Sequence, residues 1–97
     1  MSDEYPADGN GEPDPINAAM AWVIGRELRN VGGRRMSDQE LGRRIGVSKN
    51  TIQRLMAGES DFDMVRLFRI ARVLGIAPED LIRQARMRLV DPLRDSD

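Results

Sequence analysis

The chain has 97 residues, of which 40% are apolar and 32% are charged, and its formal net charge at pH 7 is -1. This length accommodates one small domain, and no apolar run approaches the length of a membrane span. Because the sequence contains neither cysteine nor histidine, it excludes a disulfide framework and the usual zinc and nucleophile–base arrangements. We therefore expect that the protein is not an enzyme and binds no metal or cofactor.

The charges are segregated along the chain. Residues 1–14 carry five acidic and no basic residues, residues 15–90 carry fourteen basic and eight acidic residues, and residues 91–97 carry three acidic and one basic residue. The central segment is therefore basic, although the whole chain is not. Residues 1–14 also hold too little apolar surface to stay folded, which predicts a disordered acidic arm, and residues 91–97 are expected to form a flexible tail.

A first helix is predicted to begin at Pro15. Asp14 is a suitable N-cap, proline is favoured at the first helical position, and Gly32 and Gly33 are expected to end the helix. Apolar residues recur between these limits at helical spacing, which predicts a buried stripe of Ile16, Met20, Val23, Ile24, Leu28 and Val31. Trp22 lies off this stripe on a polar flank, which makes it a candidate for contact with a partner.

Residues 37–58 have the pattern of two short helices joined by a glycine-centred turn. Ser37 is placed to cap the first helix, with Glu40 completing a capping box, and Ser48 is placed to cap the second, with Gly58 as its stop. Helices this short need tertiary packing, so we expect burial of their apolar residues, which are Leu41, Ile45, Ile52, Leu55 and Met56. The polar side of the second helix is then left facing outward.

Two further helices are predicted after this motif. One starts after Asp63 and ends at Gly75, with an inward side formed by Met64, Leu67, Phe68, Ala71 and Leu74. The other opens at Pro78 and carries along one side Leu81, Ile82, Ala85 and Leu89. Its last turns, through Met87 and Val90, need a partner, which is either the first helix or a second copy in a two-fold dimer.

The pattern at residues 37–58 resembles that of the lambda-repressor-like family of bacterial and phage regulators, also called the xenobiotic-response-element family. The residues that match the family's pattern are Leu41, Gly46, Val47, Ile52 and Leu55, and Gly42 matches it as a small residue midway along the first motif helix. Residues 64–81 are similar to the family's fourth helix, its Leu-Gly-aliphatic corner and its fifth helix, so the resemblance covers roughly three quarters of the chain. It implies an all-α fold: a compact five-helix lambda-repressor-like DNA-binding domain over residues 15–90, preceded by the acidic arm.

In proteins of this kind the second motif helix reads base edges in the major groove of double-stranded DNA. The candidate base contacts are Lys49, Asn50, Gln53 and Arg54. The chemistry of the groove matches Arg54 to guanine and Asn50 or Gln53 to adenine, whereas Lys49 suits a base or a phosphate. The candidate phosphate contacts lie at helix starts and among nearby basic residues, and they are Arg34, Arg35, Ser37, Arg43, Arg44, Ser48 and Thr51. For each of these side chains, the alternative to a DNA contact is an ordinary solvated position on the surface.

Three features depart from the family's pattern. Asp38 stands where the family commonly has a glutamine that touches the DNA backbone, so we expect a neighbouring arginine to neutralise it. Gly42 replaces the usual alanine, which permits close helix approach but costs up to about 1 kcal/mol of helix propensity. The segment 59–63 is acidic where relatives often approach the backbone, and this argues against ordinary DNA binding.

The function predicted from these features is sequence-specific DNA binding by a transcriptional regulator. A phage or prophage repressor that occludes a promoter is favoured, because we recognise no sensory domain in the chain. The expected partners are double-stranded DNA, a second copy or another protein, and neither a membrane nor a small-molecule substrate. No signal sequence is recognisable, so we expect a location in the bacterial cytoplasm, or in the host cytoplasm if the gene is carried by a phage.

Two other functions stay open. One is the DNA-binding antitoxin of a toxin–antitoxin pair, which uses the same fold and a disordered tail to hold the toxin. The other is a protein-interaction module that kept the fold without affinity for DNA. The acidic arm has two interpretations as well: it only aids solubility, or it screens the basic domain from non-specific DNA.

Overall fold

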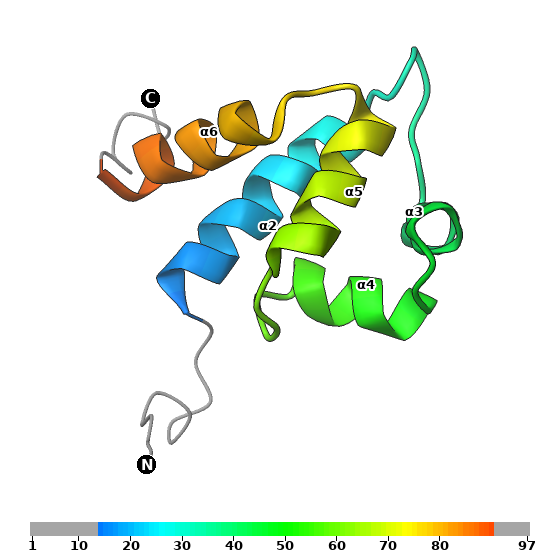
Figure 1. Cartoon of the computed structure of the whole chain (residues 1–97), viewed down its shortest axis with the longest axis horizontal. Helices are drawn as coiled ribbons and strands as arrows, with labels where there is room; N and C mark the ends of the chain where they lie inside the picture. The colour runs from blue at the N-terminus through cyan, green and yellow to red at the C-terminus, as the bar shows by residue number, and fades with distance from the viewer. Residues whose placement is uncertain (1–13, 91–97) are drawn as a thin grey trace.

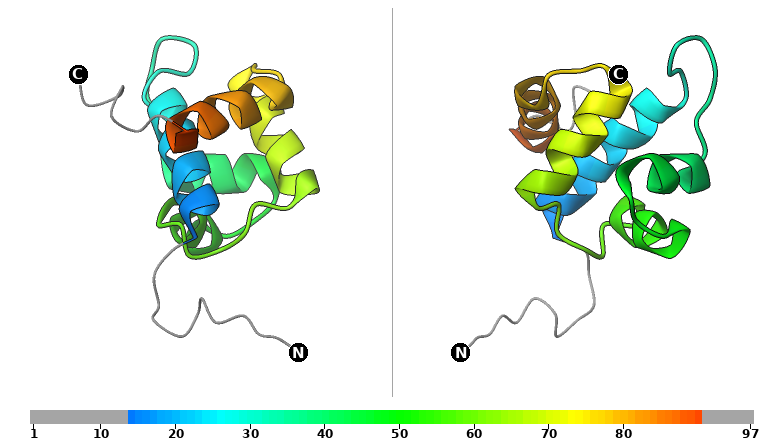
Figure 2. Two further views of the ribbon diagram at one scale, coloured as in Figure 1. Left: turned by 90° about the vertical axis from the view of Figure 1, so that its left-hand side faces the viewer. Right: turned by 45° about the vertical axis from the view of Figure 1, so that its right-hand side comes forward.

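The computed structural model describes residues 14–90, and these residues form five helices (Figure 1). The helices are α2 (Pro15–Leu28), α3 (Asp38–Ile45), α4 (Lys49–Met56), α5 (Met64–Leu74) and α6 (Pro78–Val90). Figure 2 shows α6 on one side of the molecule and α3 and α4 on the other, with α2 and α5 between them. The predicted all-α fold with five helices is confirmed for these residues. The predicted acidic arm, apart from Asp14, and the predicted tail lie outside them.

The core lies between the helices, and every helix contributes to it. The largest fully buried side chains are Val23, Ile24, Leu41, Ile52, Leu55, Ile70 and Leu81. Met36, from the segment between α2 and α3, joins the same cluster, and its amide donates to the Leu28 carbonyl at 2.8 Å. No polar or charged side chain within residues 14–90 is buried, so removal of apolar surface from water is the main stabilising term. None of these helices is both long and apolar enough to cross a membrane.

α2 begins where the sequence predicts, but its buried stripe starts later. Asp14 Oδ1 accepts a hydrogen bond from the Ile16 amide at 2.7 Å, and Pro15 is the first helical residue. Ile16 itself is 62% exposed, so its prediction as a core residue is wrong. A residue in the first turn of a helix has no preceding turn beside it, and here neighbouring helices leave it open. From Met20 to Leu28 the predicted stripe is buried.

α2 ends earlier than predicted. Its last residue is Leu28, and Val31 lies outside the helix, where its backbone pairs with that of Arg34 across a tight turn. Gly32 and Gly33 occupy the two central positions with φ of +63° and +93°. A two-residue turn of this kind requires positive φ at both positions, so the glycine pair forms a hairpin turn and does not end the helix.

The inward side predicted for α5 is partly wrong. Met64 and Phe68 are 63% and 52% exposed, whereas Leu67, Ile70 and Ala71 are buried. Both sets have helical spacing and lie on adjacent sides of the helix, so periodicity alone did not distinguish them. The apolar pair on the outer side of α5 is therefore surface and not core.

α6 opens at Pro78, as predicted, and packs along α2. Leu81 and Ala85 are buried in this contact, but Ile82 and Leu89, which were expected on the same side, stay partly exposed. They lie beside the buried stripe of the helix and not on it. Packing on α2 also leaves exposed the apolar residues of the last turns, Met87 and Val90.

Candidate nucleic-acid interface

The predicted two-helix motif is formed by α3 and α4, and each helix begins with a serine cap. Ser37 Oγ accepts from the Glu40 amide at 3.1 Å, and Ser48 Oγ accepts from the Thr51 amide at 3.1 Å. Such caps satisfy one of the amides that the first turn of a helix leaves without a partner, and the others attract anions. Both serines are exposed, so the start of each helix is accessible to a phosphate. Thr51 is half-buried, and its hydroxyl lies 3.0 Å from that of Ser48, which it helps to position.

Gly42 allows α3 and α4 to approach closely. A Cβ atom at this position would lie 2.7 Å from the Val47 carbonyl oxygen and 3.3 Å from both the Ser48 carbonyl oxygen and Ile52 Cγ1. The first distance is shorter than real Cβ atoms adopt, so an alanine here would displace the start of α4. Gly46 then ends α3 with φ of +84°, a left-handed conformation that glycine adopts without strain. The departure from the family's pattern at Gly42 thus sets how α4 sits on α3.

The side of α4 away from the core presents four polar side chains. Ile52 and Leu55 are fully buried on its inner side. The exposed residues of the helix include all four candidate base contacts, Lys49, Asn50, Gln53 and Arg54. Their spacing places them on one side of a helix. We call these four residues the recognition face.

Glu40 pairs with two arginines and does not complete the predicted capping box. Its Oε2 accepts from Arg34 at 2.9 Å and from Arg44 at 3.1 Å. The reciprocal bond to the Ser37 amide is not found among the described residues. The two arginines, which are candidate phosphate contacts, therefore share one carboxylate, while their side chains stay 65% and 50% exposed. Arg34 in this way ties the hairpin turn to α3.

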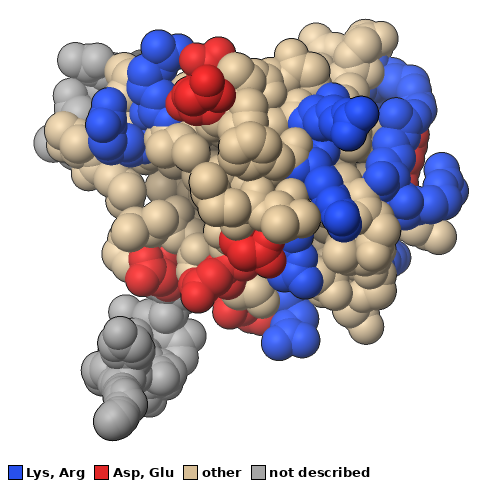
Figure 3. Space-filling model, in the orientation of Figure 1, with Lys and Arg blue, Asp and Glu red and all other residues tan. Residues whose placement is uncertain are grey.

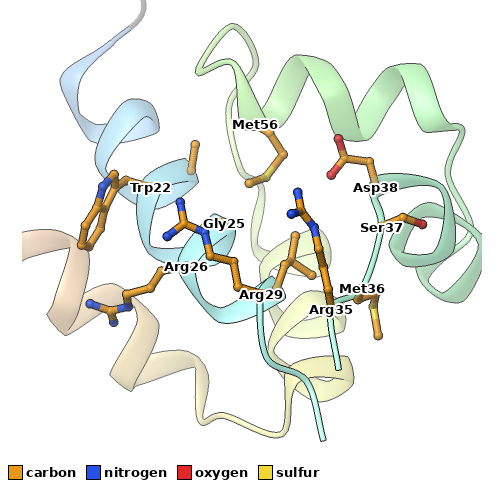
Figure 4. A pocket seen from close by; sticks show the side chains of 11 residues that line it. Trp22, Gly25, Arg26, Arg29, Arg35, Met36, Ser37, Asp38 and Met56 are labelled. Carbon is orange, nitrogen blue, oxygen red and sulfur yellow. The ribbon is translucent and has the colours of Figure 1, made fainter. Parts of the chain in front are cut away.

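A hollow of about 450 Å³ lies beside the start of α3, between α2 and the end of α4 (Figure 4). Arg29 lines it from the end of α2, Arg35 from the segment that leads into α3, and Met56 from α4. Neither guanidinium group has an ion pair or hydrogen bond with another residue of the described range. Two cations without a carboxylate partner thus lie next to Ser37. Arg35 was a candidate from the sequence, whereas Arg29 was not, because only the position at which α2 ends reveals where it lies.

Asp38 lines the same hollow in the first turn of α3. The partial positive charge at the start of a helix favours a carboxylate in this position. No arginine of residues 14–90 forms an ion pair with it, so the expected neutralisation is not made. The arginines nearest in sequence either pair with Glu40 or face the hollow unpaired.

The acidic segment 59–63 is largely explained by the fold. Asp61 Oδ1 accepts from the Asn17 side-chain amide at 2.7 Å, which ties the segment to the start of α2. Asp63 Oδ1 accepts from the Arg66 amide at 2.8 Å and caps α5, which begins directly after it, as the sequence predicts for the start of the helix. Two of the acids that argued against DNA binding therefore have structural roles.

Trp22 joins α2 to α6. The guanidinium carbon of Arg88 lies 3.8 Å from the centroid of its ring and that of Arg26 lies 5.1 Å away, both within cation–π range. Arg26 also donates to the Gln84 side chain of α6. These contacts account for the position of the tryptophan at the surface, and its role in binding a partner stays a prediction.

Two capped helices around a glycine turn, with an outward polar face and three supporting helices, define a helix-turn-helix domain. The profile of the HTH_3 helix-turn-helix family, which is of the XRE, Cro and C1 type, matches residues 26–81. The chain therefore belongs to this family of DNA-binding transcriptional regulators. Searches of curated proteins and of solved structures found no match.

Proposed function

We propose that this protein binds a specific double-stranded DNA operator through α4 and represses transcription by occluding a promoter. The recognition face carries this proposal, because four side chains with the right chemistry lie exposed on one helix. A guanidinium matches the two acceptors of guanine, and carboxamides match the donor and acceptor of adenine. The buried inner side of α4 holds these groups in place, since Ile52 and Leu55 have no exposed surface.

The proposed phosphate contacts surround the recognition face. The hydroxyls and nearby free amides of Ser37 and Ser48 supply anion sites at the starts of α3 and α4. Arg35, together with Arg29, supplies positive charge beside Ser37. These contacts fix the register of the protein on DNA without reading sequence.

Within this class, the resemblance to lambda-repressor-like proteins favours a phage or prophage repressor. Occlusion requires only that the operator overlap the promoter and that binding be tight. In a transcription reaction with purified polymerase, we expect the protein to block initiation when added before polymerase and to have little effect on open complexes already formed. Stimulation of transcription from the same promoter would contradict repression.

We further propose that the protein acts as a homodimer. Most of the exposed large apolar side chains of the described residues lie on α5 and α6, and they include Phe68, Ile82, Met87, Leu89 and Val90. Exposed apolar surface of this kind is typical of an interaction site. A two-fold dimer also matches the paired half-sites that helix-turn-helix proteins bind.

Selection of bound sequences from a random duplex library tests both proposals with the full-length protein. We expect an enriched motif with two-fold symmetry, and a sedimentation mass of two chains at the same concentration. A single enriched half-site would support DNA reading without the symmetric dimer. No enrichment by a folded protein would reject the operator proposal in favour of the antitoxin or interaction-module functions, and the next step would be co-purification of a protein partner.

A further inference from the structure

Four arginine side chains from two helices line one open depression of about 810 Å³ at the end of α3. Arg43 and Arg44 come from the last turn of α3, and Arg69 and Arg72 come from α5. Figure 3 shows Lys and Arg side chains gathered on the right-hand side of the molecule, over α3 and α5. We call these four residues the four-arginine patch. The two from α5 were not candidate DNA contacts in the sequence, because α5 was identified there only as a core helix.

Contacts within the protein account for only part of this charge. Arg44 pairs with a carboxylate of its own helix at 3.1 Å, and Arg69 Nη1 donates to the Ile45 carbonyl at 3.2 Å. The guanidinium groups of Arg43 and Arg72 have no ion pair or hydrogen bond with other residues of the described range. At least two of the four charges are therefore available for an external anion.

The ends of the two helices do not neutralise the patch either. Arginine is favoured in the last turn of a helix, where it faces a partial negative charge of about half an electron. Two helix ends together supply about one negative charge, and the Glu40 carboxylate that pairs with Arg44 supplies one more, against four positive ones. Like charges in one depression repel over distances shorter than the Debye length of about 8 Å, and a bound polyanion relieves that repulsion.

The patch adjoins the proposed DNA-binding surface. Gly46 lines the depression, and it lies two residues before Ser48, whose hydroxyl caps α4 and is a proposed phosphate contact. A DNA backbone that passes the start of α4 can therefore continue over the patch. Guanidinium groups suit such a path, because each can donate two parallel hydrogen bonds to one phosphate.

We infer that the four-arginine patch binds the DNA backbone beyond the bases that α4 reads, which makes α5 a DNA-contacting helix as well as a core helix. This inference rests on the proposed function above. Each arginine that binds a phosphate releases counterions, so the patch adds affinity and salt dependence without adding sequence preference.

The first test compares the full-length protein with Arg72→Ala on the selected operator, using Arg86→Ala as a matched control. Arg86 is an exposed arginine of α6, so both variants lose one positive charge at the surface. One phosphate contact contributes about 0.9 to the steepness with which log affinity falls against log salt concentration. When salt is raised from about 50 to about 200 mM, Arg72→Ala should therefore lose roughly threefold less affinity than the wild-type protein loses. The sequence preference of Arg72→Ala should be unchanged, and Arg86→Ala should keep the wild-type slope.

Phosphate-ethylation interference then locates the contact. For the wild-type protein we expect interference at phosphates that flank the bases read by α4, and Arg72→Ala should lose this flanking interference alone. Arg43→Ala repeats the test from α3, so that a folding defect in one variant does not decide the outcome. The Tm of each variant, with and without inorganic phosphate, shows whether the patch holds a free anion instead of DNA.

A wild-type salt slope and wild-type interference in both patch variants would overturn the inference and leave the proposed function intact. If the two patch variants bind DNA as the wild-type protein does but no longer bind an acidic protein that the wild-type protein binds, the inference is overturned as well, and the patch is assigned to that partner. If the wild-type protein prefers no DNA sequence at all, the proposed function itself fails first, and the two failures are thereby distinguishable.

Discussion

The α3–α4 pair and the outer surface of α5 and α6 are built in opposite ways. In the pair, the apolar side chains are buried, as in Ile52 and Leu55, and the polar side chains face outward. On the outer surface of α5 and α6, Phe68 is 52% and Val90 is 77% exposed. The apolar side of the first region is covered, because its two helices pack on each other and on α2 and α5. The second presents apolar surface that contacts within the described chain do not cover.

The largest expected effect is on stability, to which the two regions should contribute very differently. Ile52→Ala removes a fully buried side chain between α3 and α4, and we expect the free energy of unfolding to fall by about 2–5 kcal/mol. Val90→Ala is the control, and its effect should stay within about 0.5 kcal/mol. Urea unfolding followed by circular dichroism measures both. Similar losses for the two variants would contradict the contrast between a packed pair and an open surface.

The close approach of α4 to α3 is tested by a pair of glycine substitutions within helices. At Gly42 a Cβ atom meets a backbone oxygen at 2.7 Å, whereas at Gly25 it meets only the flexible end of Met56 at 3.3 Å. We expect Gly42→Ala to destabilise the protein by about 1–3 kcal/mol despite the helix propensity of alanine. Gly25→Ala should be neutral or stabilising by up to about 1 kcal/mol. Thermal unfolding compares the two variants. A stabilised Gly42→Ala variant would show that a Cβ atom at this position does not push α4 away from α3.

The outer surface is tested by placing a charge on it. Val90→Asp should weaken the proposed dimer by about tenfold or more, because a carboxylate there would have to leave water on association. The fold should be unaffected, since the side chain is exposed in the single chain. Sedimentation equilibrium over a range of concentrations gives the Kd. Gln39→Asp introduces the same charge at an exposed polar position of α3 and serves as a control. An unchanged Kd in Val90→Asp would place the interface elsewhere.

The smallest effect concerns the acidic arm. If the arm screens the basic domain, removing residues 1–13 should strengthen binding to random duplex at low salt and have less effect at high salt. Asp14 must be retained, because it caps α2. Fluorescence anisotropy with a duplex that lacks the operator measures the change. Equal affinities of the full and trimmed proteins at low salt would mean that the arm does not screen the domain.

The sequence predicted best those features that depend on local interactions. Asp14, Ser37 and Ser48 cap their helices as expected, because capping involves only the next few residues. The sequence predicted exposure wrongly where the neighbouring helices decide which side of a helix is covered. Phe68 has the spacing of a core residue, but the side of α5 that is buried is the adjacent one, with Leu67, Ile70 and Ala71. Arg69 and Arg72 were missed for the same reason. Only the packing of α5 beside the end of α3 brings them to Arg43.

The central claim is that the recognition face reads bases, and Arg54→Ala tests it most directly. Sequence selection with this variant and with the wild-type protein, under the same salt, compares the preference at each position of the operator. We expect the variant to lose about 1–3 kcal/mol of discrimination at one base pair, a guanine in the wild-type motif, and to keep the other preferences. An unchanged preference at every position would contradict the assignment of Arg54, and with it the docking of α4 in the major groove.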